Sequence, residues 1–148
     1  MYEHLLVPID GSELSNRAIE HSIGLAKMLG ASITGFTAEP PLPVLVVEQA
    51  AVAYDLTTFQ EHEKRCEAHA RELLEAFGAK AKHAGVHFDG QFVITDNVQQ
   101  AIVDTAQKQA CDLIVMITHG RHGLDALIHG SLTKSVLAHS QVPLLILH

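Results

Sequence analysis

The chain has 148 residues, 47% of them hydrophobic, and a formal net charge of −7. This length and hydrophobic content predict one folded domain over residues 1–148 and exclude an intrinsically disordered chain. The negative charge and the absence of tryptophan disfavour binding to nucleic acids or acidic membranes. The two cysteines, at positions 66 and 111, lie far apart in unlike contexts, so we expect free thiols in a reducing cytoplasm.

The N-terminal residues lack a basic region followed by an apolar segment, which disfavours a signal peptide. No apolar run approaches the roughly 20 residues that a membrane-spanning helix requires. We therefore expect a cytoplasmic protein without a membrane span.

Apolar runs alternate with helical periodicities along the chain. We expect strands at 4–9, 32–38, 88–95, 113–117 and 143–147, and helices at 14–29, 58–83, 98–109 and 131–139. Ser12 is expected to cap the first helix and Gly30 to end it. The inner faces of the first two helices are expected to carry Ala18, Ser22, Leu25, Ala26 and Leu29, and then Phe59, Cys66, His69, Leu73, Leu74 and Phe77.

The segment from 39 to 57 is unusually long for a connection inside a compact domain. It holds three prolines, a run of aliphatic residues and an alanine-rich stretch. We expect a loop with a short helix within 48–54. Two interpretations of this loop stay open: it packs on its own domain, or it forms a functional or partner surface.

Strands that alternate with helices require crossover connections, and these predict an open, doubly wound, five-stranded parallel sheet of the α/β class. Ligands of such sheets bind at the carboxyl ends of the strands, where the strand order reverses. This rule places residues 9–10, 38–39 and 118–131 around one crevice.

A glycine-containing loop joins the strand at 113–117 to the last helix. It contains Gly120, Gly123 and Gly130, and Ser131 is expected to open the helix as its capping residue. Glycines allow close backbone approach, and the free N–H groups of a first helical turn attract anions. The segment therefore predicts a phosphate site.

These residues resemble the universal stress protein family. Its nucleotide-binding members share a pattern of Gly, two residues, Gly, nine residues, Gly, then Ser or Thr. Gly120, Gly130 and Ser131 match the second half of this pattern, and its first glycine falls on Ile117. The resemblance covers nearly all of the chain, from Leu5-Leu6-Val7-Pro8-Ile9-Asp10-Gly11-Ser12 to Val142-Pro143-Leu144-Leu145-Ile146-Leu147.

The resemblance implies a flavodoxin-like or Rossmann-like fold of the adenine nucleotide alpha hydrolase-like type. It implies that ATP or AMP binds, with or without Mg²⁺. The residues that match the family's nucleotide site are Pro8, Ile9, Asp10, Ala38, Met116, Ile117, His119, Gly120, Arg121, Gly130, Ser131, Leu132 and Thr133.

Several of these positions have alternative interpretations. Asp10 matches an aspartate near the ribose, and a carboxylate accepts hydrogen bonds from a diol, but it could instead tighten the turn before the helix. His119 could contact phosphate or brace its loop, and Arg121 could contact phosphate or stay in solvent. Ile117 replaces a glycine with a β-branched side chain, which predicts a weaker or shorter ligand.

Other chemistries find no support in the sequence. Eleven histidines are present without the spacing of a structural zinc site, so we expect no metal ligand. The P-loop, the dinucleotide-binding Gly-x-Gly-x-x-Gly and the hydrolase Gly-x-Ser-x-Gly patterns are absent. No catalytic residue is expected, and any ATP hydrolysis should be slow.

The resemblance thus predicts a cytoplasmic protein that acts in stress response through nucleotide-linked interactions with unidentified partner proteins. One alternative is a nucleotide-free dimeric interaction module. Another is a weak ATPase or an autophosphorylating protein with Ser131 or Thr133 as acceptor. We also expect a homodimer through Val142–Leu147, because in the family the last strand pairs with its twin and an aliphatic edge strand favours pairing.

Overall fold

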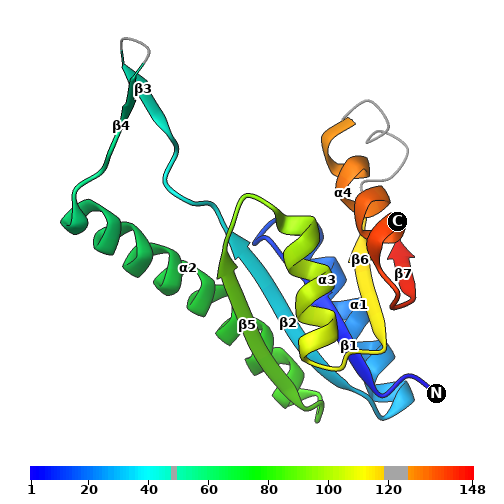
Figure 1. Cartoon of the computed structure of the whole chain (residues 1–148). Coiled ribbons are helices and arrows are strands. Elements are labelled where there is room, and N and C mark those ends of the chain that lie inside the picture. Colours follow the sequence, from blue (N-terminus) through cyan, green and yellow to red (C-terminus); the bar gives the residue numbers. More distant parts are fainter. Residues whose placement is uncertain (48–49, 119–126) are drawn as a thin grey trace.

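A five-stranded parallel sheet forms the centre of the molecule in this computed structural model (Figure 1). The structure describes residues 1–47, 50–118 and 127–148, with the backbone alone at 46–47, 50–52 and 127–131. The strand order is β5-β2-β1-β6-β7, and the five parallel strands confirm the predicted open, doubly wound sheet. The strands are β1 (His4–Pro8), β2 (Ser32–Glu39), β5 (Phe88–Ile94), β6 (Leu113–Ile117) and β7 (Leu144–Leu147).

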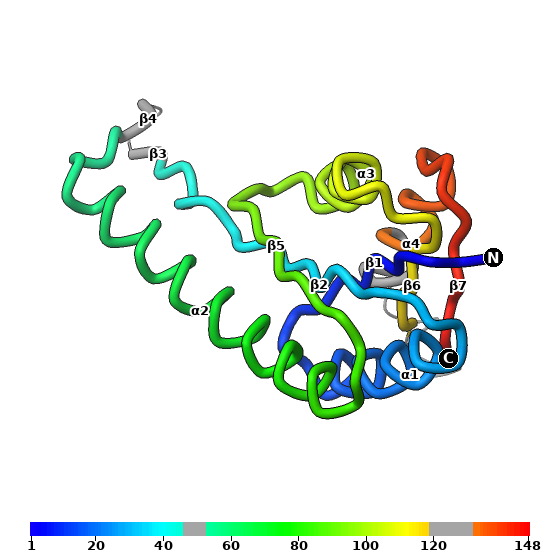
Figure 2. Tube along the Cα trace, turned by 90° about the horizontal axis from the view of Figure 1, so that it is seen from below, coloured from blue at the N-terminus to red at the C-terminus, as the bar shows by residue number. Residues whose placement is uncertain are grey.

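In the described residues, the two faces of the sheet are covered by the helices α1 (Glu13–Leu29), α2 (Leu56–His83), α3 (Val98–Lys108) and α4 (Leu127–His139). Figure 2 shows α1 and α2 on one side and α3 and α4 on the other. Each strand contributes side chains to both faces of the sheet, because successive side chains point in opposite directions. On β1, Leu5 and Val7 pack with Ile19 and Phe77, whereas Leu6 packs on the opposite face with the α3 and α4 residues.

The strand order reverses at the centre of the sheet, because β2 and β6 lie on opposite sides of β1. The chain passes from β1 towards β5 through α1 and α2, and then returns through α3 to β6. The connections that leave β1 and β6 therefore diverge at their carboxyl ends. This divergence opens the crevice that the sequence predicts beside residues 9–10.

Helix α4 begins four residues earlier than expected, at Leu127 rather than at Ser131. Gly130 and Ser131 thus lie in the helix and do not form its N-terminus, so the predicted capping role of Ser131 is wrong. One glycine in a helix costs only about 1 kcal/mol relative to alanine. That cost is too small for Gly130 to stop a helix that begins with Leu127 and Ile128.

The segment between β2 and α2 forms a hairpin of β3 (Leu45–Val47) and β4 (Ala50–Val52), not the expected short helix in 48–54. Valines at 46, 47 and 52 favour a strand because branching at Cβ suits extended backbone. Figure 1 shows the hairpin beyond the end of the sheet, beside the first turns of α2.

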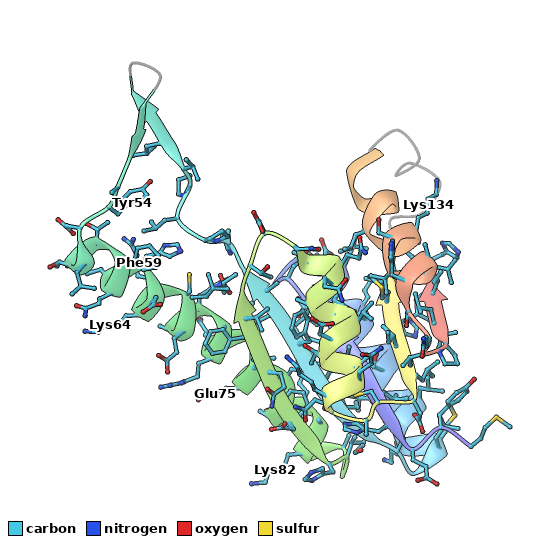
Figure 3. The ribbon with its side chains drawn as sticks, viewed as in Figure 1. Tyr54, Phe59, Lys64, Glu75, Lys82 and Lys134 are labelled. Atoms are coloured by element: carbon cyan, nitrogen blue, oxygen red, sulfur yellow. The ribbon has the colours of Figure 1, made fainter. Side chains whose placement is uncertain are left out.

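The N-terminal part of α2 also extends past the sheet. Three residues that were expected on inner faces are exposed, two on α2 and one at the end of α1. Phe59 is 50% exposed, His69 is exposed, and Leu29 at the end of α1 is 40% exposed. Figure 3 shows Tyr54 and Phe59 at the end of α2 near the hairpin and Lys82 at the opposite end. Among the described residues, no helix combines the length and apolarity needed to cross a membrane.

Both cysteines are free and buried, as expected from their separation in sequence. Burial, which disfavours the thiolate, raises the pKa of the Cys111 thiol to about 11. Burial is also the main cause that raises the pKa of Cys66, with the negative charge of Glu39 adding to it. Both thiols are therefore protonated at neutral pH.

A Ser22→Ala substitution should stabilise the fold by about 1 kcal/mol. Ser22 is fully buried on the inner face of α1, and its Oγ has no hydrogen-bond partner among the described residues. Removing this hydroxyl removes the cost of its desolvation. Urea denaturation followed by circular dichroism measures the change, and a lower midpoint in the variant would contradict the prediction.

Candidate functional site

A cavity of about 270 Å³ lies at the carboxyl ends of β1, β2 and β6, between these strands and helices α1, α3 and α4. It occupies the crevice that the strand reversal opens. Its walls are formed by Pro8, Ile9, Asp10, Ser12, Leu14, Ser15, Phe36, Ala38, Val98, Ile102, Met116, Ile117, Leu132 and Thr133.

The cavity brings together eight of the thirteen site residues expected from the sequence: Pro8, Ile9, Asp10, Ala38, Met116, Ile117, Leu132 and Thr133. His119, Gly120 and Arg121 lie outside the described residues. For Gly130 and Ser131 only the backbone is described, in the first part of α4. The structure thus gathers one half of the predicted site, and the predicted phosphate loop stays an expectation.

The inner part of the cavity is apolar. Phe36 and Ala38 come from β2, Met116 comes from β6, and Val98 and Ile102 come from α3. Phe36, Ile102 and Met116 also belong to the hydrophobic core on the α3 and α4 face, which fixes their positions. Such walls favour a flat, largely apolar ring system over a charged group.

The polar groups of the cavity are concentrated where β1 leads into α1. Ser12 caps α1, as predicted, because its Oγ accepts a hydrogen bond of 3.2 Å from the Ser15 backbone N–H. Asp10 Oδ1 accepts hydrogen bonds from the Ser12 N–H at 3.0 Å and from Ser15 Oγ at 2.6 Å. Asp10 therefore braces this turn, as one interpretation predicted, and it also lines the cavity, where its contact with a ligand stays a prediction.

Gly11 makes this turn possible. Its φ angle is +80°, a region that residues with a Cβ rarely adopt. A Cβ at this position would also lie 3.0 Å from Cδ2 of Leu73 on α2. Glycine therefore allows α1 to start directly after Asp10 and keeps the aspartate at the cavity.

Sequence reasoning missed six residues that line the cavity: Ser12, Leu14, Ser15, Phe36, Val98 and Ile102. The sequence could have indicated Ser12 and Ser15 as lining residues, since both follow the end of the first strand and lie three residues apart, within one helical turn. The sequence could not have indicated the α3 residues, because a helix position that faces a cavity has the same apolar character as one that faces the core.

The described lining of the cavity can bind a ligand, and it pairs no nucleophile with a histidine or lysine base. Ser15 donates its proton to Asp10, yet the described residues that line the cavity include no histidine, lysine, arginine or cysteine. In the described part of the chain, no three His, Cys, Asp or Glu side chains gather as a metal site would require. Apolar walls beside a carboxylate suit a ligand with a flat ring and hydroxyl groups.

Comparison with known proteins gives the family of this chain. The model of the universal stress protein family matches residues 1–148. The chain belongs to this family. A relative in it, universal stress protein A homolog 1 of Coxiella burnetii, is 30% identical over 140 residues, which are 92% of this chain and 89% of the relative.

Solved structures of universal stress proteins share the fold. UspA from Lactobacillus plantarum superposes with a TM-score of 0.77 at 18% identity, covering 99% of this chain and 98% of that one. A universal stress protein in complex with cAMP gives 0.71 at 23% identity, covering 99% and 97%. One from Archaeoglobus fulgidus in complex with dAMP gives 0.64 at 15% identity, covering 99% and 98%. The fold is therefore that of the universal stress proteins.

Proposed function

We propose that this universal stress protein binds an adenine nucleotide, ATP or AMP, in the cavity at the carboxyl ends of β1, β2 and β6. The observation that carries the proposal is the gathering of Asp10, Ala38, Met116 and Thr133 in one cavity with apolar walls. The structural relatives bound to cAMP and dAMP support it, because both ligands carry adenine.

The size of the cavity bears on which part of the nucleotide it encloses. Its volume of about 270 Å³ lies just below the range of roughly 300–1,000 Å³ that is typical of sites for drug-sized ligands. We infer that it takes the adenine and ribose, while the phosphates extend towards the start of α4. Ile117 lines the cavity, and its side chain limits the space beside β6.

Isothermal titration of the purified protein with AMP, and with ATP and Mg²⁺, tests this proposal, with GMP as the comparison ligand. Saturable heat with both adenine nucleotides is expected. Mass spectrometry of the denatured protein would detect a nucleotide that co-purifies. No heat and no co-purified nucleotide would favour a nucleotide-free interaction module, and phosphate release from ATP would indicate hydrolysis.

The biological role that we propose follows the family: a cytoplasmic stress response through partner proteins that respond to the bound nucleotide. We also propose a homodimer through β7. This strand lies at the edge of the sheet, and Leu145 and Leu147 line a groove of about 420 Å³ against α1. Met28, on the α1 side of the groove, is 80% exposed. An aliphatic edge strand beside an apolar groove favours pairing with a second copy.

A Leu145→Lys variant should shift the protein from dimer to monomer, since a lysine ammonium at the seam would be desolvated without a partner. Light scattering coupled to size-exclusion chromatography at micromolar concentration measures the mass. Leu137→Lys on α4 is the matched control, because Leu137 is 57% exposed and is not among the residues that line the groove. A monomer mass for the unmodified protein would contradict the dimer.

A further inference from the structure

The carboxylate of Asp10 is held in place by the first turn of α1. Ser15 Oγ donates a hydrogen bond of 2.6 Å to Asp10 Oδ1, and it accepts one of 2.9 Å from the Asp10 backbone N–H. The Ser12 N–H donates a further hydrogen bond of 3.0 Å to the same Oδ1. Ser15 thus contacts both the backbone and the side chain of Asp10, and it is only 4% exposed.

The direction of the Ser15 hydroxyl follows from the number of hydrogen bonds it can make. A serine hydroxyl carries one proton and two acceptor lone pairs. The Asp10 N–H takes one lone pair, and the Ser12 hydroxyl, 3.4 Å away, takes the other. The single Ser15 proton therefore goes to Asp10 Oδ1, which fixes the rotation of the carboxylate plane.

A fixed carboxylate binds hydroxyl groups better than a rotating one. Freezing a side chain on binding costs conformational entropy, and a side chain that the fold already holds avoids that cost. Both Asp10 and Ser15 line the 270 Å³ cavity, whereas the walls supplied by β2 and α3 are apolar or aromatic. The Asp10–Ser15 pair is therefore the part of the described lining best suited to bind a ligand hydroxyl.

We propose that Ser15 is a positioning residue that holds the Asp10 carboxylate for the ribose hydroxyls, so that the site selects ligands with an intact ribose diol. The inference rests on the proposed nucleotide binding and deepens it. Ser15 itself does not need to touch the ligand. Its effect on binding should therefore depend on whether the ligand has hydroxyls for Asp10 to accept.

The test compares the affinities for AMP and 2′,3′-dideoxy-AMP by isothermal titration. The native protein should bind AMP about tenfold more tightly than the dideoxy analogue, the factor expected for one hydrogen bond to a charged group. Ser15→Ala should weaken AMP binding by a similar factor and leave dideoxy-AMP binding nearly unchanged, so the affinity ratio falls towards one.

Two variants separate positioning from a general effect on the fold. Ser22→Ala removes another buried serine hydroxyl from α1, one without a partner in the described structure, and should leave the ratio unchanged. Ser15→Thr keeps the hydroxyl and should keep the native ratio of the affinities for AMP and 2′,3′-dideoxy-AMP. Cavities of about 270 and about 70 Å³ adjoin Ser15 and leave room for the added methyl group. Thermal unfolding of each variant checks that it is folded.

Three results would overturn the inference. The first is an unchanged affinity ratio in Ser15→Ala, whether both ligands lose affinity equally, which indicates a structural role alone, or neither does. The second applies if that variant does not fold, and it is a lost affinity ratio in Ser15→Thr. The third is a native protein that binds AMP and its dideoxy analogue equally, which leaves the proposed nucleotide binding intact. A native protein that binds neither ligand overturns the proposed function and this inference with it.

Discussion

An Ala38→Phe variant is expected to bind AMP at least about a hundredfold more weakly than the native protein while it keeps its fold. Ala38 lies near the carboxyl end of β2 and lines the cavity, so a phenyl ring at this position would occupy the space proposed for the adenine. Loss of the ring contacts would cost nearly 3 kcal/mol, which corresponds to that factor. The fold should persist because the cavity, not the packed core, takes the added volume.

The measurement is titration with AMP at 25 °C, together with the thermal unfolding midpoint. Ala79→Phe is the matched control, since it introduces the same ring at an exposed position on α2. The control should bind AMP as the native protein does. If Ala38→Phe is folded and binds AMP with native affinity, the nucleotide lies elsewhere and the cavity loses its proposed role.

A Phe77→Ala substitution is expected to destabilise the protein by about 3–5 kcal/mol. Phe77 is fully buried where α2 packs on the sheet, and its ring lies 4.7 Å from that of Phe88, centroid to centroid. Both rings lie close to Gly35, where an added Cβ would lie 2.7 Å from Phe88 and 3.0 Å from Phe77. Truncation would leave a cavity that these well-packed neighbours cannot close.

Urea denaturation followed by circular dichroism measures this loss, which is a large part of the roughly 5–15 kcal/mol that stabilises a typical domain. Phe59→Ala supplies the control, because it makes the same change on the same helix at a residue that is 50% exposed. The control should lose less than about 1 kcal/mol. Equal losses in the two variants would show that burial does not distinguish the two phenylalanines.

The sequence itself determined the strands, the sheet and one half of the cavity. A continuous run of apolar residues such as Leu5, Leu6 and Val7 specifies a strand buried on both faces, and the burial of all three confirms it. Ser12 and Gly30 specify the ends of α1, because capping and left-handed backbone are local requirements. Asp10 and Ala38 were predicted to lie beside one crevice because the carboxyl ends of parallel strands meet at one edge, and both residues line the cavity.

The tertiary structure alone decided which apolar residues face the core, the cavity or solvent. Phe59 and Phe77 both fit the inner stripe of α2, but only Phe77 lies over the sheet, since α2 is longer than the strands beside it. Ile102 belongs to the core, as its helical pattern indicates, and it also lines the cavity, which the pattern does not reveal. Periodicity fixes the face of a helix on which a residue lies, whereas the position of that helix relative to the sheet depends on packing between distant segments.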